Sequence, residues 1–452
     1  MRASMASRRA RILRNLGLGA CAFAGGLAGT LLQGHAAATP GEASPYANLS
    51  IFARALSHIE VSHVEPPDQD ALIYGAIRGM VETLDPHSSF LTPDQYRMLM
   101  SDTEGQFGGI GIEVDVRDGW LVVHGVIAGG PAEEAGIQPG DRFLAIDGLG
   151  ARDMRLSDAV EHMRGAPGTP VTIRLRREGQ EQGIELTLTR RVIHVEAVEA
   201  RVLPSRVFYA RVRSFSETTT DELRAALDRA VSETSSAGGV SGVLLDLRGN
   251  PGGLLDEAVR MSDEFLTEGT IVSTRGRDGQ VLEEASAHSA GTRPDWPMVV
   301  LVDHYTASAA EIVAGALHDH HRAVLVGQTT WGKGSVQNLI ELPDGSALKL
   351  TIARYYTPSG VSIQARGIDP DIVVEDLDAE ALRALHDRSP VISEASLEGH
   401  LAAESGHEER ATPRDEPRTA ATGDEQSFAD DYQARTALGV LTTLIAERGR
   451  AH

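Results

Sequence analysis

The sequence is poor in cysteine and in basic residues. Cys21 is the single cysteine among 452 residues, so an intramolecular disulfide and a thiolate zinc site are both excluded. Lys and Arg total 42 against 64 Asp and Glu, a net charge of -22. Such a chain repels a phosphate backbone, so we expect no nucleic acid among its partners. We also expect no cofactor and no bound metal.

Lysine is the scarcest basic residue. Only Lys333 and Lys349 are lysines, and the other forty basic residues are arginines. Arginine stays protonated, whereas a buried lysine can lose its proton and act as a base. Lys333 lies between two glycines that allow close backbone approach, and the neighbouring Trp331 is expected to exclude water. Lys333 is therefore the candidate general base, with a buried structural lysine as the alternative.

The first 38 residues have the pattern of a secretory signal. They contain five arginines and no acidic residue, followed by an apolar stretch over 16–32 and by small residues up to Ala38. Cleavage after Ala38 would leave 37 basic and 64 acidic residues, a net charge of about -27. An uncleaved anchor is the alternative, and lipidation at Cys21 is disfavoured because the apolar stretch continues beyond it. We expect an exported protein in the periplasm, soluble or anchored to the inner membrane and facing the periplasm.

The rest of the chain is too long for one core and changes character several times. Apolar residues at helical spacing give way to short β-type runs with glycine turns, and then to alternating buried strands and helices. These patterns predict an α/β multidomain protein with helical segments at both ends. The expected boundaries are 1–38 for the signal or anchor, 39–104 for an N-terminal helical region, 105–190 for a β-rich domain, 191–385 for an α/β core, 386–426 for a disordered linker and 427–452 for a C-terminal helix.

Ser308 is the candidate nucleophile. It follows a buried strand and opens a predicted helix, where free backbone N–H groups can stabilise an oxyanion, and Ala309 would supply one of them. A glycine turn after another buried strand would supply the second donor, with Gly252 preferred and Gly253 next. The alternative is that Ser308 only caps the helix, with Glu311 as its capping-box partner.

Gln337 is the candidate partner of Lys333 and lies four residues after it in the chain. This spacing brings side chains together on a helical turn but separates them by about 13 Å on a strand. If Gln337 orients Lys333, the chain must turn between them. A neutral amide could hold the amine without the rise in its pKa that a carboxylate would cause.

Six blocks together resemble the carboxyl-terminal processing peptidases, or tail-specific proteases, of serine-lysine peptidase family S41. The blocks are Gly75–Met80, Leu84–Phe90, Phe107–Gly111, Arg248–Gly253, Ala307–Glu311 and Gly332–Gln337. The resemblance implies a crotonase-like (ββα) core with an inserted PDZ domain at 105–190. It also implies that Ser308, Lys333 and Gln337 are the catalytic residues, with oxyanion donors near Gly252 and Ala309.

The implied PDZ domain would bind the C-terminal tail of a substrate. Converging N–H groups of its glycine-rich loop could hold the terminal carboxylate, and its isoleucines could line an apolar pocket. The loop residues concerned are Gly108, Gly109, Ile110, Gly111 and Ile112. Expected partners are proteins or peptides with accessible C-termini, a second copy through the terminal helices, and an adaptor or activator protein.

Three other interpretations fit parts of the sequence. A noncatalytic PDZ adaptor would bind exported protein tails without cutting them. A penicillin-type acyl enzyme is suggested by the S-x-x-K spacing of Ser346 and Lys349, but the surrounding alternation predicts a hairpin strand rather than the helix that this chemistry needs. A metal site at His318, His320 and His321 is disfavoured against solvated residues at a helix end.

Overall fold

The computed structural model describes residues 48–180, 182–375, 428 and 431–451. The predicted signal or anchor and the predicted linker at 386–426 lie outside these residues. The chain divides into two compact units, 1–76 and 77–452. The first unit contains α2 (Leu49–Ser62), whose apolar residues include the exposed Ile51 and Phe52, and the start of α3 (Gln69–Glu82). Within the described residues, no helix is both long and apolar enough to cross a bilayer.

The second unit begins with the end of α3, a short strand and a capped helix. Strand β1 (Ser89–Leu91) is followed by α4 (Pro93–Thr103). Thr92 and Gln95 form a capping box, in which each side chain accepts a hydrogen bond from the backbone N–H of the other residue. Pro93 occupies the first turn, where its missing N–H costs nothing. The helix therefore begins at a well-defined cap.

The region after α4 forms a sheet of short strands around its own apolar core. Strands β3, β4, β5, β7 and β8 follow one another in this sheet, and β2 pairs with β9 beside it. Fully buried residues of the core include Phe143, Ile146 and Ile173. The elements are β2 (Gln106–Gly109), β3 (Ile112–Arg117), β4 (Trp120–Val126), α5 (Pro131–Glu134), β5 (Arg142–Ile146), β6 (Leu149–Gly150), α6 (Leu156–Met163), β7 (Pro170–Arg176), β8 (Ile184–Thr189) and β9 (Arg191–His194).

A six-stranded sheet organises the rest of the unit. Its order is β10-β11-β12-β15-β16-β19, and every neighbouring pair after the antiparallel β10 and β11 is parallel. The elements are β10 (Val198–Val202), β11 (Val207–Val212), α7 (Thr219–Thr234), η1 (Ser235–Ala237), β12 (Gly242–Asp246), α8 (Leu255–Asp263), β15 (Met298–Val302), α9 (Ala309–Asp319), β16 (Val324–Gly327), β19 (Ile372–Val373) and α12 (Tyr432–Ala451).

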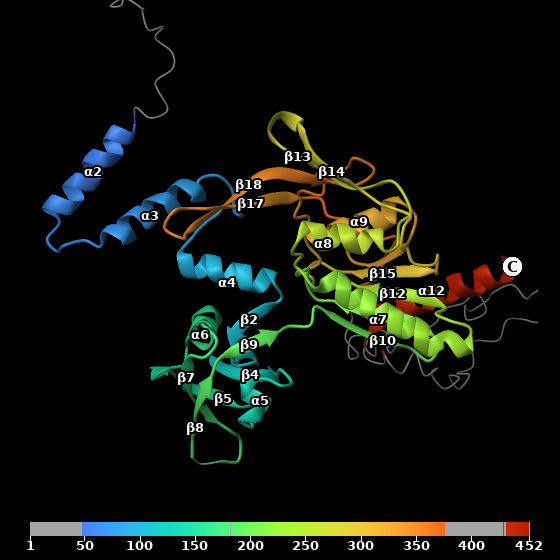
Figure 1. Cartoon of the computed structure of the whole chain (residues 1–452), viewed down its shortest axis with the longest axis horizontal. Coiled ribbons are helices and arrows are strands. Elements are labelled where there is room, and N and C mark those ends of the chain that lie inside the picture. The colour runs from blue at the N-terminus through green and yellow to red at the C-terminus, as the bar shows by residue number, and fades with distance from the viewer. Residues whose placement is uncertain (1–47, 181, 376–427, 429–430, 452) are drawn as a thin grey trace, which may run out of the picture. The chain divides into compact units, whose positions relative to one another are not determined.

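Both faces of this sheet are covered, as the continuous apolar strands predict. Alternate residues such as Leu245 and Val300 pack with helices α7, α8 and α9. Their neighbours Leu244 and Val299 pack against α12, which covers the other face (Figure 1). The expected α/β multidomain architecture is confirmed. The parallel strands place the loops that follow β12, β15 and β16 at one edge of the sheet, and these loops carry the candidate site.

A second sheet supports the lysine segment. Its order is β1-β18-β13-β14, and β17 also pairs with β18. The strands are β13 (Thr270–Arg275), β14 (Val281–Ser286), β17 (Ser335–Glu341) and β18 (Ala347–Tyr356), with η2 (Arg277–Gly279) between the first two. Lys349 lies within strand β18, and Ser346 precedes it and bonds to Asp344. The hairpin prediction is correct, and the helix required by a penicillin-type S-x-x-K motif is not formed there.

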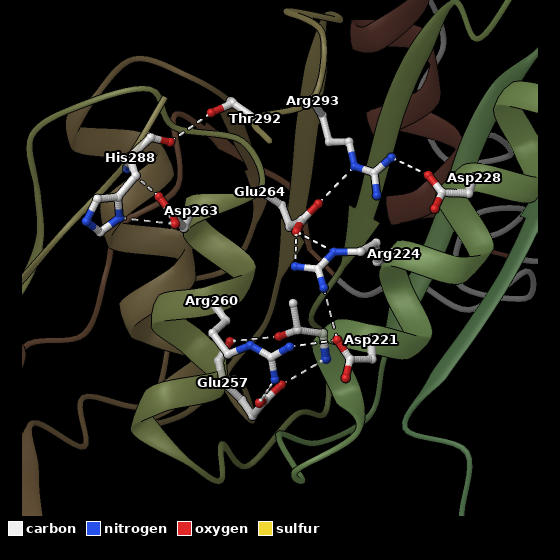
Figure 2. Close-up of polar contacts among 11 residues, drawn as sticks. Asp221, Arg224, Asp228, Glu257, Arg260, Asp263, Glu264, His288, Thr292 and Arg293 are labelled. Atoms are coloured by element: carbon white, nitrogen blue, oxygen red, sulfur yellow. Dashed lines mark hydrogen bonds and ion pairs between the residues drawn. The ribbon is translucent and has the colours of Figure 1, made fainter. Parts of the chain in front are cut away.

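A network of ion pairs fixes α8 against α7 (Figure 2). Glu264 is 6% exposed and accepts hydrogen bonds from Arg224 on α7 and from Arg293 in the segment before β15. Glu257 is 4% exposed, pairs with Arg260 and accepts from a backbone N–H of α7. Because helix α8 directly follows the glycine turn at 252–253, these bonds hold one end of that turn.

Candidate active site

Ser308 lies in a sharp turn at the N-terminus of α9. Its backbone has φ 55° and ψ -118°, a conformation that residues other than glycine seldom adopt and that costs about 1–3 kcal/mol. The residue is 7% exposed and is flanked by Ala307 and Ala309. The Ala309 N–H has no hydrogen-bond partner among the described residues, so it is free to donate beside the Ser308 hydroxyl.

The glycine turn after β12 lies against Ser308. A Cβ added at Gly252 would come within 2.7 Å of the Ser308 Cβ and 2.8 Å of the Ala307 carbonyl oxygen, and the residue has φ +101°. The Gly252 N–H donates to the side-chain oxygen of Asn250 at 2.8 Å. The Gly253 N–H has no partner among the described residues. The turn thus has the predicted position, but the N–H that is free in this conformation belongs to Gly253.

Asn250 and Arg248 fasten this turn on either side. Asn250 is fully buried, its amide donates to the Val212 carbonyl, and its own carbonyl accepts from the Ala307 N–H at 2.9 Å. Arg248 makes three hydrogen bonds to Asp246, one of them from its backbone N–H, and further ones to Asp431, beside α12. The turn is therefore tied to the elbow at Ser308 and to the C-terminal helix.

Lys333 lies in the loop between β16 and β17 and is partly buried. Burial lowers the pKa of its ammonium, the positive charge of Lys349 lowers it further, and Glu311 acts in the opposite direction. A Cβ on Gly334 would come within 2.4 Å of the Gln364 backbone nitrogen, so the predicted close approach is confirmed. Trp331 is 62% exposed, so the prediction that it excludes water is wrong in this conformation.

Glu311 joins the two segments. Its carboxylate accepts from the Ser308 N–H at 2.8 Å and from the Lys333 N–H at 2.9 Å. It also accepts from the Gly332 N–H and the Thr330 hydroxyl. Burial raises the pKa of Glu311, and these four donors oppose the rise by stabilising the anion. The sequence indicated Glu311 only as a capping partner, and nothing local indicated its bonds to the lysine loop.

Gln337 is on strand β17 rather than on a helical turn. The pairing of β17 with β18 is irregular at this point, because its register shifts between Val336 and Gln337. The Gln337 amide nitrogen donates to Ser335 Oγ at 2.8 Å and to Thr351 Oγ1 at 3.3 Å. Within the described residues, no hydrogen bond joins the Lys333 amine to Gln337 or to the Ser308 hydroxyl. The three predicted residues are brought to neighbouring segments, and their side chains are not yet linked.

The glycine-rich loop between β2 and β3 has unused backbone donors. The N–H groups of Ile110 and Gly111 have no hydrogen-bond partner among the described residues, although both residues are buried. Gly111 has φ +76°, which turns successive N–H groups to one side. Gly108 and Gly109 pair with β9, Ile110 is 2% exposed within the apolar core, and Ile112 packs against that core. Two unused donors thus lie where the sequence predicts carboxylate binding.

The histidines at the C-terminal end of α9 have ordinary partners. His318 lies 3.2 Å from an Asp371 oxygen, and His320 lies 2.8 Å from the Thr270 carbonyl oxygen. In the part of the chain that the structure describes, no group of three or more His, Cys, Asp or Glu side chains is arranged to hold a metal ion.

Two family models match the chain. Residues 206–374 match the model of peptidase family S41, and residues 122–177 match that of the PDZ domain. The S41 match contains the Ser308 elbow, the Gly252 turn and the Lys333 loop. The matched class is therefore a serine-type peptidase that also carries a PDZ domain.

Curated relatives make the assignment more specific. The chain is 39% identical to a carboxy-terminal-processing protease of Bartonella bacilliformis, over 83% of this chain and 85% of the relative. It is 37% identical to the carboxy-terminal processing protease CtpA of Bacillus subtilis, over 71% and 68%. A solved photosystem II D1 C-terminal processing protease is 32% identical over 73% of this chain and 88% of that one, with a TM-score of 0.44. The protein belongs to the carboxy-terminal processing proteases of family S41.

Proposed function

We propose that this protease cleaves peptide bonds with Ser308 as nucleophile, Lys333 as general base and Gln337 as the residue that orients the base. The observation that carries the proposal is the Glu311 carboxylate, which accepts backbone N–H bonds from Ser308 and Lys333 at the same time. One buried group thus holds the hydroxyl-bearing turn beside the lysine-bearing loop. The strained backbone of Ser308 and the lowered pKa of Lys333 support the same assignment.

The reaction has two stages. The neutral Lys333 amine takes the hydroxyl proton as Ser308 Oγ bonds to the substrate carbonyl carbon, and the carbonyl oxygen becomes an oxyanion. The carbon–nitrogen bond then breaks, and the lysine ammonium returns its proton to the leaving amine. Water hydrolyses the acyl-serine ester in the same way, giving its proton to Lys333, which passes it back to Ser308 Oγ. The enzyme ends in its starting protonation state.

The oxyanion is held by backbone N–H groups. The Ala309 N–H is free and adjacent to the nucleophile. The Gly252 turn supplies the second donor. Gly252 is the predicted residue, and its N–H can donate to the oxyanion once its hydrogen bond to Asn250 breaks. The neighbouring Gly253 N–H has no partner among the described residues and can donate without such a change.

The substrate enters as a protein tail. The free N–H groups of Ile110 and Gly111 bind the terminal carboxylate of a protein or peptide, which then lies along the sheet as an added strand. An upstream peptide bond of the same polypeptide reaches Ser308. The protein is exported to the periplasm, soluble or anchored to the inner membrane. It pairs with a second copy through its terminal helices, and an adaptor or activator protein delivers its substrates.

The test compares the purified full-length chain with its Ser308→Ala variant. Each is incubated with an unfolded protein ending in apolar residues and with the same protein ending in aspartates. We expect the first substrate to be cut by the wild type only, and the second to be cut more slowly because its tail fits the apolar PDZ site less well. Equal persistence of substrate with both enzymes would favour the noncatalytic adaptor. Equal cutting by both would remove Ser308 from the mechanism.

A further inference from the structure

The amide of Gln337 has a defined direction. Its nitrogen end faces two hydroxyl oxygens, Ser335 Oγ at 2.8 Å and Thr351 Oγ1 at 3.3 Å. An amide oxygen and nitrogen have almost the same shape, so this direction depends on which neighbours can accept and which must donate. The neighbours of Thr351 settle the question.

Thr351 can only accept from Gln337. Its hydroxyl has one proton, which it donates to Asp85 Oδ1 at 3.0 Å. An ionised carboxylate cannot donate in return, so the remaining capacity of Thr351 Oγ1 is that of an acceptor. Gln337 must therefore present its NH2 group to Thr351, and its carbonyl oxygen remains available to accept a bond from an amine.

Asp85 is held in the ionised form. Partial burial opposes ionisation, but hydrogen bonds from the Ser88 hydroxyl, from the backbone N–H groups of His87 and Ser88, and from Thr351 bring the pKa of Asp85 to about 2. Ser88 also accepts from the Thr351 backbone N–H, so the turn at 85–88 grips strand β18 at two points. Asp85 is 266 positions before Thr351 in the chain.

We propose that Thr351 and Asp85 are positioning residues that fix the amide of Gln337 with its carbonyl oxygen as the acceptor for Lys333. This inference rests on the proposed roles of Gln337 and Lys333. Asp85 thus orients the Gln337 amide without placing a negative charge next to the lysine. The neutral Thr351 hydroxyl and Gln337 amide separate the Asp85 carboxylate from the Lys333 amine. A carboxylate in direct contact would raise the lysine pKa and weaken it as a base at neutral pH.

A double-mutant cycle tests the inference. We would measure kcat and KM on a fluorogenic peptide for the full-length wild type, Thr351→Val, Gln337→Ala and the double variant. Valine keeps the shape of threonine and removes the hydroxyl. We expect Thr351→Val to lower kcat about tenfold with KM unchanged, the size expected for one hydrogen bond. In the Gln337→Ala background the same change should have no further effect. Thr351→Ser should restore the wild-type kcat.

Two further variants separate positioning from structural damage. Asp85→Ala should lower kcat in the wild type but not in Gln337→Ala; an equal loss in both backgrounds would make Asp85 a structural residue and overturn its part of the inference. Thr274→Val, in β13 of the same sheet, is the matched control, because its buried side chain has no hydrogen bond among the described residues. It should keep the wild-type kcat.

The outcomes distinguish this inference from the proposed function. An equal loss from Thr351→Val in both backgrounds, or no loss in the wild type, would overturn the positioning role while the serine peptidase assignment stands. A wild-type kcat in Gln337→Ala beside an inactive Ser308→Ala would overturn the role of Gln337 and this inference with it. Activity in Ser308→Ala would overturn the proposed function itself.

Discussion

The turn at Ser308 and the strand at Gln337 are held by different kinds of bonds. Ser308 is fixed by its own strained backbone, by the helix that it begins and by a carboxylate three residues away. Gln337 is fixed by hydrogen bonds to side chains. One of these, Thr351, is in turn bonded to Asp85, which lies 266 positions earlier in the chain. The nucleophile is thus oriented locally, whereas the partner of the base depends on the packing of distant segments.

This difference separates a preformed half of the site from an adjustable half. The Ser308 hydroxyl and the Ala309 N–H are in place without any side-chain link to Lys333. Lys333 itself is in a loop beside the exposed Trp331, and no hydrogen bond of its amine to Ser308 or Gln337 is found among the described residues. Rotation of the Lys333 side chain would complete the site while Glu311 keeps the backbones of Ser308 and Lys333 in place. Substitutions at the base, at the nucleophile turn and at the link between them should therefore differ in the size of their effects.

Replacing the base should have the largest effect. Lys333→Arg keeps the charge but cannot give up its proton, so we expect activity to fall by about 10⁴-fold or more. In the wild type, activity should rise with pH through an apparent pKa below the ordinary lysine value of 10.5, because burial and Lys349 favour the neutral amine that accepts the proton. Hydrolysis rates measured across pH would show both. Lys349→Arg is the control, and it should remain active because its positive charge is kept. An active Lys333→Arg variant would exclude lysine as the base.

Crowding the nucleophile side should have a smaller but still large effect. A methyl group in Gly252→Ala would meet Ser308 and Ala307 at less than 3 Å, and the left-handed backbone would be strained as well. We expect kcat to fall by about 10²–10³-fold, the loss typical of a damaged oxyanion site. Gly439→Ala in α12 has open space around it and should leave kcat unchanged. Equal activity of the two variants would show that the turn does not serve the oxyanion.

Weakening the link should have the smallest effect. Glu311→Gln keeps the size of the side chain. Its amide nitrogen, itself a donor, would however face backbone N–H groups that now donate hydrogen bonds to the carboxylate. We expect kcat to fall by roughly 10–100-fold, in line with the loss of one or two charge-assisted hydrogen bonds. Kinetics together with a thermal melt would measure the change. Glu341→Gln, at the exposed end of β17, is the matched control. A wild-type kcat for Glu311→Gln would mean that the two halves are aligned by other contacts.

Local patterns in the sequence were enough to predict part of this site. The buried strand before Ser308, the helix after it and the glycines around Lys333 all produce signals within a few residues of each other. The contacts of Asp85 with Thr351 and of Glu311 with the lysine loop depend on strand register and loop packing, which no local period encodes. The same limit explains Gln337: its spacing from Lys333 left a helical turn and a strand both open, and the pairing of β17 with β18 made it a strand residue.

The bond between Arg248 and Asp431 has a consequence for the order in which the enzyme matures. The two residues are 183 positions apart, and Asp431 lies beyond Ser308, Lys333 and Gln337 in the chain. During synthesis the glycine turn therefore receives its last fastening only after the whole catalytic set has been made. A growing chain therefore contains Ser308, Lys333 and Gln337 before Asp431 is available to bond to Arg248 beside the glycine turn.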